Sequence, residues 1–142
     1  MKLWNQNSKD KNSAIDYFLS SEDIALDQEL FLYDIEASIA HAHELEKINI
    51  FTKTEARKVT SSLKKLGRLF QTNKFKLTTK YEDCHSAIED FLIKELGSVG
   101  KKIHTGRSRN DQVMVAMRLY TRNKLDEIQL INLKVAKAFL EK

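Results

Sequence analysis

A group of cationic and amide side chains in the segment 100–113 has the chemistry of an anion-binding site. Arg107, Arg109 and Asn110 all follow Gly106 closely in the chain. Guanidinium groups bind carboxylates through two parallel hydrogen bonds, and glycine lets the backbone approach a ligand because it has no side chain. These residue types at this spacing predict a site for a small polyanion, such as a dicarboxylate or a phosphate.

The same segment predicts the start of a long helix. Ser108 and Asp111 have the spacing of a capping box, in which each side chain binds the backbone N–H of the other residue. A helix that begins there directs free N–H groups and the positive end of its dipole toward the loop. Either arginine taken alone could instead be solvated or paired with a nearby acid, because surface ion pairs are common.

Composition limits the class of protein. The chain has 142 residues, which suits one domain or a piece of a larger protein, and 42% hydrophobic with 31% charged residues is typical of a globular protein. We find no apolar run of about 20 residues, as a membrane span needs, and no signal-peptide core in residues 1–10. The single cysteine, Cys84, excludes an internal disulfide and favours a cytoplasmic location. The net charge of +4 permits anionic partners without requiring nucleic acid.

The fold class follows from the scarcity of helix breakers. The chain contains no proline and only 4 glycines, and its Leu, Ala, Lys and Glu content favours helices. We therefore expect an all-α protein, with an acidic turn at residues 20–23. Apolar periodicity and capping residues predict helices at residues 14–19, 28–47, 53–71, 81–96 and 108–142. Thr52 and Glu55 have capping-box spacing at the start of the helix at residues 53–71, and Gly97 is expected to end the helix at residues 81–96.

The last predicted helix differs from the others because it is apolar on several sides. A helix of this kind needs several neighbours, and the preceding helices are too short to cover it along its length. We expect a small N-terminal helical domain at residues 1–107. Residues 108–142 would then begin a central helical bundle, which is completed by further chain or by other subunits.

An alternative from another class is a basic DNA-binding module. Residues 28–47 and 53–71, joined by a short turn, have the outline of a helix-turn-helix unit. The charges on the second helix are not interleaved with aromatic or amide side chains that read bases, so a solvated face is the favoured interpretation. Its basic residues are Lys53, Arg57, Lys58, Lys64, Lys65 and Arg68.

The histidines of the predicted helices offer few ligand positions. His41 and His43 are two residues apart, so a helix cannot direct both toward one metal ion. His85 lies in the first turn of its predicted helix, where the positive end of the dipole favours the neutral imidazole. A neutral imidazole both donates and accepts hydrogen bonds, although a purely structural role for His85 stays open.

The run His-Thr-Gly-Arg-Ser-Arg-Asn-Asp-Gln-Val at residues 104–113 resembles the signature segment of the argininosuccinate lyases, within the fumarase and aspartase superfamily. Three further blocks, at residues 3–4, 33–42 and 82–85, are similar to recognisable blocks of the same family. The resemblance covers nearly the whole chain and implies the N-terminal third of such a lyase.

The resemblance implies a function in arginine biosynthesis. Members of the family cleave argininosuccinate to arginine and fumarate, and the resemblance implies neither a metal nor a cofactor. By resemblance, Asn110 hydrogen-bonds the substrate, and Arg107 and Arg109 shape the site for its carboxylates. His85 contacts the succinyl part, and Asp27 faces the arginine part.

One position departs from the family, and the catalytic segments are not found in this sequence. Asp23 stands where many members carry a serine that binds substrate. The family's general base comes from a Thr-His segment, and its acid comes from a Gly-Ser-Ser-x-Met-Pro loop that a chain without proline cannot contain. Family active sites combine three subunits of a homotetramer. We therefore expect a small-molecule substrate, no nucleic-acid or membrane partner, and no lyase activity from these residues alone.

Overall fold

The computed structural model describes residues 13–78 and 80–141, with side chains described from residue 24 onward. Every regular element in these ranges is a helix, so the expected all-α class is confirmed. The elements are α1 (Ser13–Lys47), α2 (Lys53–Gln71), α3 (Cys84–Leu96), α4 (Ser98–Lys101), the 3₁₀-helix η2 (Lys102–His104) and α5 (Arg109–Leu140).

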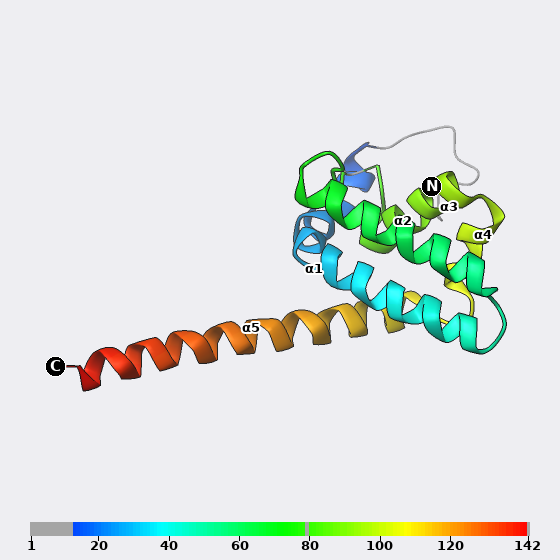
Figure 1. The fold of residues 1–142 in the computed structure, drawn as a ribbon. Helices are drawn as coiled ribbons and strands as arrows, with labels where there is room; N and C mark the ends of the chain where they lie inside the picture. Colours follow the sequence, from blue (N-terminus) through cyan, green and yellow to red (C-terminus); the bar gives the residue numbers. More distant parts are fainter. Residues whose placement is uncertain (1–12, 79, 142) are drawn as a thin grey trace.

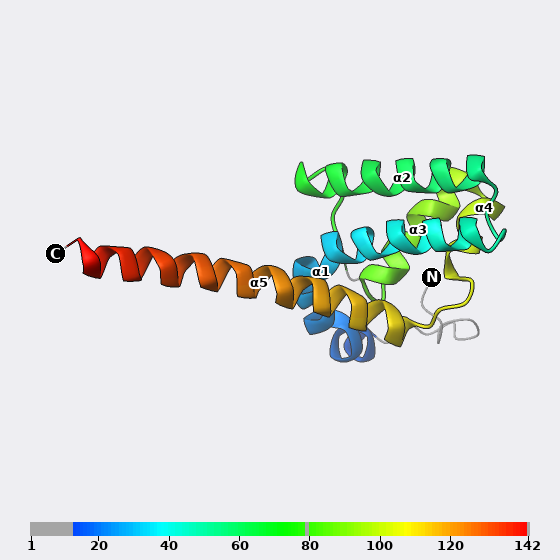
Figure 2. The same cartoon turned by 60° about the horizontal axis from the view of Figure 1, so that its bottom comes forward.

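Helices α1, α2 and α3 enclose one hydrophobic core. The first two lie side by side, with α3 and α4 packed against them, and α5 crosses α1 and extends away from the rest (Figures 1 and 2). Aromatic rings of α1 and α2 meet in the core, where the centroids of Phe31 and Phe70 are 4.5 Å apart. The completely buried aliphatic residues of this core include Val59, Leu63, Leu66 and Leu92.

Helix α1 is longer than the sequence predicts. We expected a turn at residues 20–23 between two helices, and this expectation is wrong because α1 is a single element over 35 residues. The Ser-Ser-Glu-Asp segment contains neither proline nor glycine. The helix propensity of these residues is only modestly lower than that of alanine, so the helix continues through them without a break.

Capping residues set the starts of the next helices largely as expected. Thr52 and Glu55 form the predicted capping box of α2, with Thr52 N–H donating to Glu55 Oε2 at 2.8 Å. Helix α3 begins at Cys84, three residues later than predicted, because Asp83 is its N-cap and accepts from the N–H of Ser86 at 2.7 Å.

The segment between α3 and α5 is more ordered than the loop that we expected. Gly97 ends α3 with a positive φ of 59°, as predicted for a glycine at that place. The short helices α4 and η2 follow it directly. Gly100 allows this tight packing, because a Cβ there would lie 2.3 Å from the carbonyl oxygen of Leu92.

Helix α5 begins as predicted and then leaves the body of the molecule (Figure 1). Ser108 N–H donates to Asp111 Oδ2 at 2.8 Å in the predicted capping box. Asn123 Nδ2 donates to the hydroxyl of Tyr33 on α1 at 2.9 Å, and every described residue after Lys124 is exposed. No helix in the described part of the chain is long and apolar enough to cross a membrane.

Candidate functional site

Two acids on α1 hold the first turn of α3. Asp27 and Asp34 are seven residues apart, about two helical turns, so both lie on one face of α1. Asp27 Oδ2 accepts a hydrogen bond from the backbone N–H of Cys84 at 2.8 Å. Asp34 Oδ2 lies 2.6 Å from Nδ1 of His85. The two predicted residues Asp27 and His85 therefore lie on one seam between α1 and α3, where His85 is buried and Asp27 is half-buried.

The Asp34–His85 pair changes the expected charge of the histidine. His85 is 3% exposed and Asp34 is 0% exposed. Burial by itself lowers the pKa of His85, but the hydrogen bond and the charge of Asp34, aided by Asp83 and Asp27, outweigh it and raise the pKa. Our expectation of a neutral imidazole, which considered only the helix dipole, is therefore wrong in direction.

The carboxyl of Asp27 and the thiol of Cys84 are also affected by their buried positions. Burial raises the pKa of Asp27, against the opposing hydrogen bond from Cys84. Burial, together with the charge of Asp34, raises the pKa of the Cys84 thiol far above its usual range. The sulfur is therefore a protonated thiol at neutral pH and a poor nucleophile.

Asp34, Cys84 and His85 are residue types that bind metals, and their ligand atoms lie within 4.8 Å of one another. The contact between Nδ1 and Oδ2 is 2.6 Å long. A tetrahedral ion bound to both atoms by bonds of about 2.1 Å would hold them about 3.4 Å apart. The geometry therefore fits a shared proton better than a metal ion.

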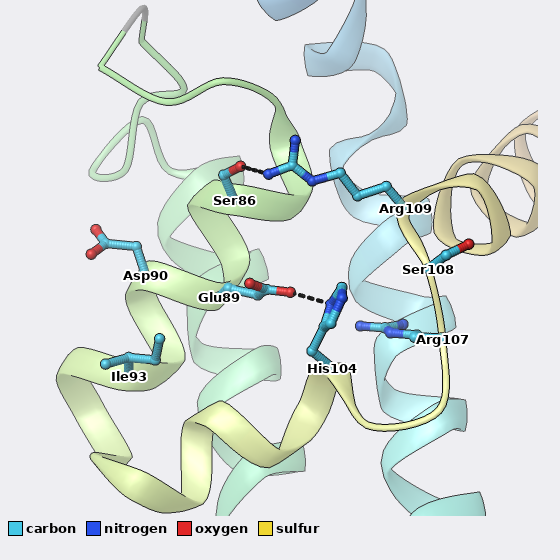
Figure 3. Close-up of a pocket in the computed structure, with 8 residues that line it drawn as sticks. All are labelled: Ser86, Glu89, Asp90, Ile93, His104, Arg107, Ser108 and Arg109. Atoms are coloured by element: carbon cyan, nitrogen blue, oxygen red, sulfur yellow. Dashed lines mark hydrogen bonds and ion pairs between the residues drawn. The ribbon is translucent and has the colours of Figure 1, made fainter. Parts of the chain in front are cut away.

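Arg109 is already engaged by acids of the chain. Its Nη1 lies 2.6 Å from Glu82 Oε1 and 3.1 Å from Asp83 Oδ2, and its Nη2 donates to Ser86 Oγ at 3.0 Å (Figure 3). Burial alone lowers the pKa of Arg109, but the hydrogen bond to Glu82 and the charges of both acids raise it. Arg109 thus joins the start of α5 to the start of α3.

Arg107 has a different environment. Its Nη2 donates to Ser38 Oγ at 3.2 Å, and its Nε is buried and has no hydrogen-bond partner in the described part of the chain. Among the described residues, no carboxylate oxygen lies within 4.0 Å of its nitrogen atoms. Burial lowers the pKa of Arg107, opposed by the charges of Asp34 and Glu89. Of the two arginines, Arg107 is therefore the one whose guanidinium is not paired with an acid of the described residues.

A cavity of about 590 Å³ lies between α3 and the segment before α5 (Figure 3). Nδ1 of His104 lies 2.7 Å from Oε1 of Glu89 across it. Its polar and cationic side chains suit a charged ligand more than an apolar one. The residues that line it are Ser86, Glu89, Asp90, Ile93, His104, Arg107, Ser108 and Arg109.

The structure brings the predicted residues together only in part. Arg107 and Arg109 share the cavity, whereas Asp27 and His85 lie on the seam between α1 and α3 and do not line it. Arg109 connects the two groups, because it binds Ser86, the neighbour of His85 in the chain. Asn110 is exposed in the first turn of α5. The side chain of Asp23 lies outside the described residues.

Sequence reasoning gave no role to Asp34 and His104. Asp34 carried a usable signal, because it stands two helical turns after Asp27 and between the core residues Phe31 and Ile35. An acid on the apolar side of a helix needs a partner. His104 lies inside the signature run, but its partner Glu89 is on a different helix.

Comparison with known proteins assigns the chain to a family. A family model described as "Lyase" matches residues 8–142. The argininosuccinate lyase of Xanthomonas euvesicatoria pv. vesicatoria (strain 85-10) is 44% identical over 140 residues, which cover 99% of this chain and 32% of the relative. The argininosuccinate lyase of Xylella fastidiosa (strain Temecula1 / ATCC 700964) is 42% identical over 140 residues, which again cover 99% of this chain and 32% of the relative.

The chain thus spans about a third of the length of the curated relatives that it matches. This fraction agrees with the resemblance described above, which implied the N-terminal third of such a lyase. Nothing in these comparisons favours the DNA-binding alternative, and the basic face of α2 carries at least one internal ion pair, between Lys65 and Glu95 of α3. Because the family model covers nearly all of its residues, the chain belongs to the lyase family.

Proposed function

We propose that the chain forms the N-terminal third of an argininosuccinate lyase, which cleaves argininosuccinate to arginine and fumarate in the cytoplasm. The observation that carries the proposal is the 44% identity to a protein of that name over 99% of the chain. In the reaction, a proton leaves the carbon next to a carboxylate, an aci-carboxylate carbanion forms, and the C–N bond to the guanidinium breaks.

The described geometry supports binding of the succinyl carboxylates. The substrate is rich in carboxylates, and the raised pKa of His85 favours a cationic imidazole. Arg107 has donors that no acid of the described residues occupies, so it is suited to bind a carboxylate directly. Arg109 is held by Glu82 and Asp83, and we assign it the task of shaping the site.

The remaining proposed contacts come from α5 and α1. Asn110 is exposed in the first turn of α5, where an amide can hydrogen-bond a ligand at the capped helix start. Asp27 would face the arginine part of the substrate, and partial burial raises the pKa of its carboxyl against the hydrogen bond from Cys84 and the charge of His85. Asp23 would lie near the same end of the substrate.

We further propose that the catalytic base and acid come from other segments of a homotetramer. Apolar residues on the far part of α5 are exposed, which supports its assembly into a central helical bundle beginning at residue 108. A site built from several subunits also fits the finding that neither Asn110 nor His85 is among the described residues that line the cavity containing the arginines.

The experiment compares the full-length lyase that carries this chain with the isolated 142-residue chain. Argininosuccinate is added to each, and the ultraviolet absorbance of fumarate is followed. We expect fumarate from the full-length protein and none from the isolated chain. Absence of fumarate from a folded, tetrameric full-length protein would refute the proposed activity, and fumarate from the isolated chain would refute the dependence on other segments.

A further inference from the structure

We propose that Asp34 is a positioning residue for His85: it holds the imidazole through Nδ1 and so reserves Nε2 for a carboxylate of the substrate. The proposal rests on the proposed function, in which His85 contacts the succinyl part. Asp34 itself would not touch the substrate.

The contact is built from rigid parts. Asp34 lies within α1 and His85 in the first turn of α3, and both side chains are buried. The second acid of the seam, Asp27, fixes the backbone of Cys84 immediately before His85. With the backbone held on one side and Nδ1 bound at 2.6 Å, the ring has little freedom to rotate.

The hydrogen bond also decides which nitrogen serves a ligand. A carboxylate accepts from Nδ1–H, so in the neutral ring Nε2 is the nitrogen without a proton, and in the cationic ring both nitrogens donate. Among the described residues, the hydrogen bonds of the His85 ring use Nδ1 only. Nε2–H of the cationic ring is therefore the donor that remains for an anion.

The charges around the ring favour that cationic form. Asp34 and Asp27 face it from α1, Asp83 lies at the start of α3, and together they raise the pKa of His85 against the effect of burial. Cys84 is a neutral thiol and adds no charge. Arg107 lies on the segment before α5 and interacts with Asp34 through its charge. The second oxygen of Asp34, Oδ1, is buried and has no hydrogen-bond partner among the residues that the structure describes, so the His85 contact is the main one of this carboxyl there.

Kinetics of the full-length lyase test whether Asp34 acts through His85. Asp34→Asn keeps the size of the side chain, and we expect it to reduce kcat/KM about 10- to 100-fold, as expected when a hydrogen bond to a charged group is lost. His85→Asn should reduce it at least as much, and the double variant should be no worse than His85→Asn. Glu44→Gln, an exposed acid on the same helix, is the control and should change nothing.

Additive losses in the double variant would overturn the proposal, as would unchanged kcat/KM in Asp34→Asn. Thermal unfolding of each variant separates loss of folding from loss of positioning. The pH profile provides a further readout, because Asp34→Asn should move the limb that belongs to His85 toward lower pH.

Nuclear magnetic resonance of the 142-residue chain with ¹⁵N-labelled histidine gives a test that needs no lyase activity. In the wild type, we expect Nδ1 to keep its proton as the pH rises and Nε2 to lose it first; His85→Asn assigns the signals. The opposite tautomer in a folded chain would overturn the proposal even if the full-length protein is an active lyase. The expected tautomer together with an inactive full-length protein would instead refute only the proposed function.

Discussion

The two halves of α5 differ although they belong to one continuous helix. Near its start, Gln112 and Ala116 are buried and the capping box is complete. Near its end, Ile131, Leu133 and Leu140 are exposed, Leu140 by 87%. Figure 2 shows this half projecting alone from the other helices. The first half is therefore stabilised by packing against α1, whereas the second half keeps an apolar surface that no other described residue of the chain covers.

The largest expected effect concerns the second half. In the full-length lyase, Ile131→Asp would place an unpaired charge in the proposed bundle, which is strongly destabilising. Because the proposed active sites combine several subunits, we expect both dissociation of the tetramer and complete loss of fumarate formation. Light scattering and the absorbance assay measure these two properties.

Lys137→Gln is the matched control, because Lys137 is an exposed polar residue of the same half. It should remain tetrameric and active. A tetrameric, active Ile131→Asp variant would show that this half of α5 is not part of a subunit interface, and that its exposure in the isolated chain has no functional counterpart.

The second prediction compares Arg107, which precedes α5, with Arg109, the first residue of α5. Arg107→Ala should raise KM by about 10- to 100-fold, because it removes a charged hydrogen-bond donor from the substrate, with little change in stability. Arg109→Ala leaves Glu82 and Asp83 without their cation, so it should lower the unfolding temperature as well as activity. Steady-state kinetics and thermal unfolding of the full-length lyase distinguish the two variants. A lower unfolding temperature in Arg107→Ala, with a raised KM and unchanged stability in Arg109→Ala, would contradict the roles that we assign to the two residues.

The third prediction uses the two capping boxes as a matched pair. Ser108→Ala and Thr52→Ala each remove an N-cap hydroxyl and should each cost about 1 kcal/mol of unfolding free energy. Only Ser108 lines the cavity that contains the arginines, so only Ser108→Ala should also weaken substrate binding. Chemical denaturation measures the unfolding free energies, and steady-state kinetics of the full-length lyase measure KM. Equal effects of the two variants on KM would contradict the placement of the substrate site at the start of α5.

The smallest expected effect is a pH dependence of stability. The folded pKa of His85 is raised, so its contribution is fully present below the unfolded value of about 6.5 and is lost as pH rises through the folded pKa. Between pH 6 and 8, the unfolding free energy of the 142-residue chain should therefore fall more steeply in the wild type than in Asp34→Asn. Urea denaturation at several pH values measures the two slopes, and parallel slopes would contradict the pairing as a source of stability.

The parts of the fold that depend on nearby residues could be predicted from the sequence. The capping boxes at Thr52 and Ser108 and the end of α3 at Gly97 involve residues a few positions apart, and all three are confirmed. The turn predicted at residues 20–23 failed because turn-favouring side chains do not by themselves stop a helix that is extended on both sides.

The parts of the site that depend on distant residues could not be predicted in the same way. The pairing of Asp34 with His85 spans 51 positions, and the binding of Arg109 by Glu82 and Asp83 joins two helix starts. Residue types suggested a cationic site for anions, but only the packing shows that Arg109 is paired with acids, whereas Arg107 contacts a hydroxyl and no acid of the described residues. The roles of Asp27, His85 and Asn110 toward substrate stay predictions.

The central claim is that the capped start of α5 binds the substrate, and Asn110 tests it most directly. We would measure kcat/KM for argininosuccinate in the full-length lyase with Asn110→Ala, and with Asn123→Ala as a matched control on the same helix, where the amide binds Tyr33 instead. We expect a loss of about tenfold or more for Asn110→Ala, from one lost hydrogen bond in the site, and near wild-type activity for Asn123→Ala. Equal activity of the two variants would contradict it.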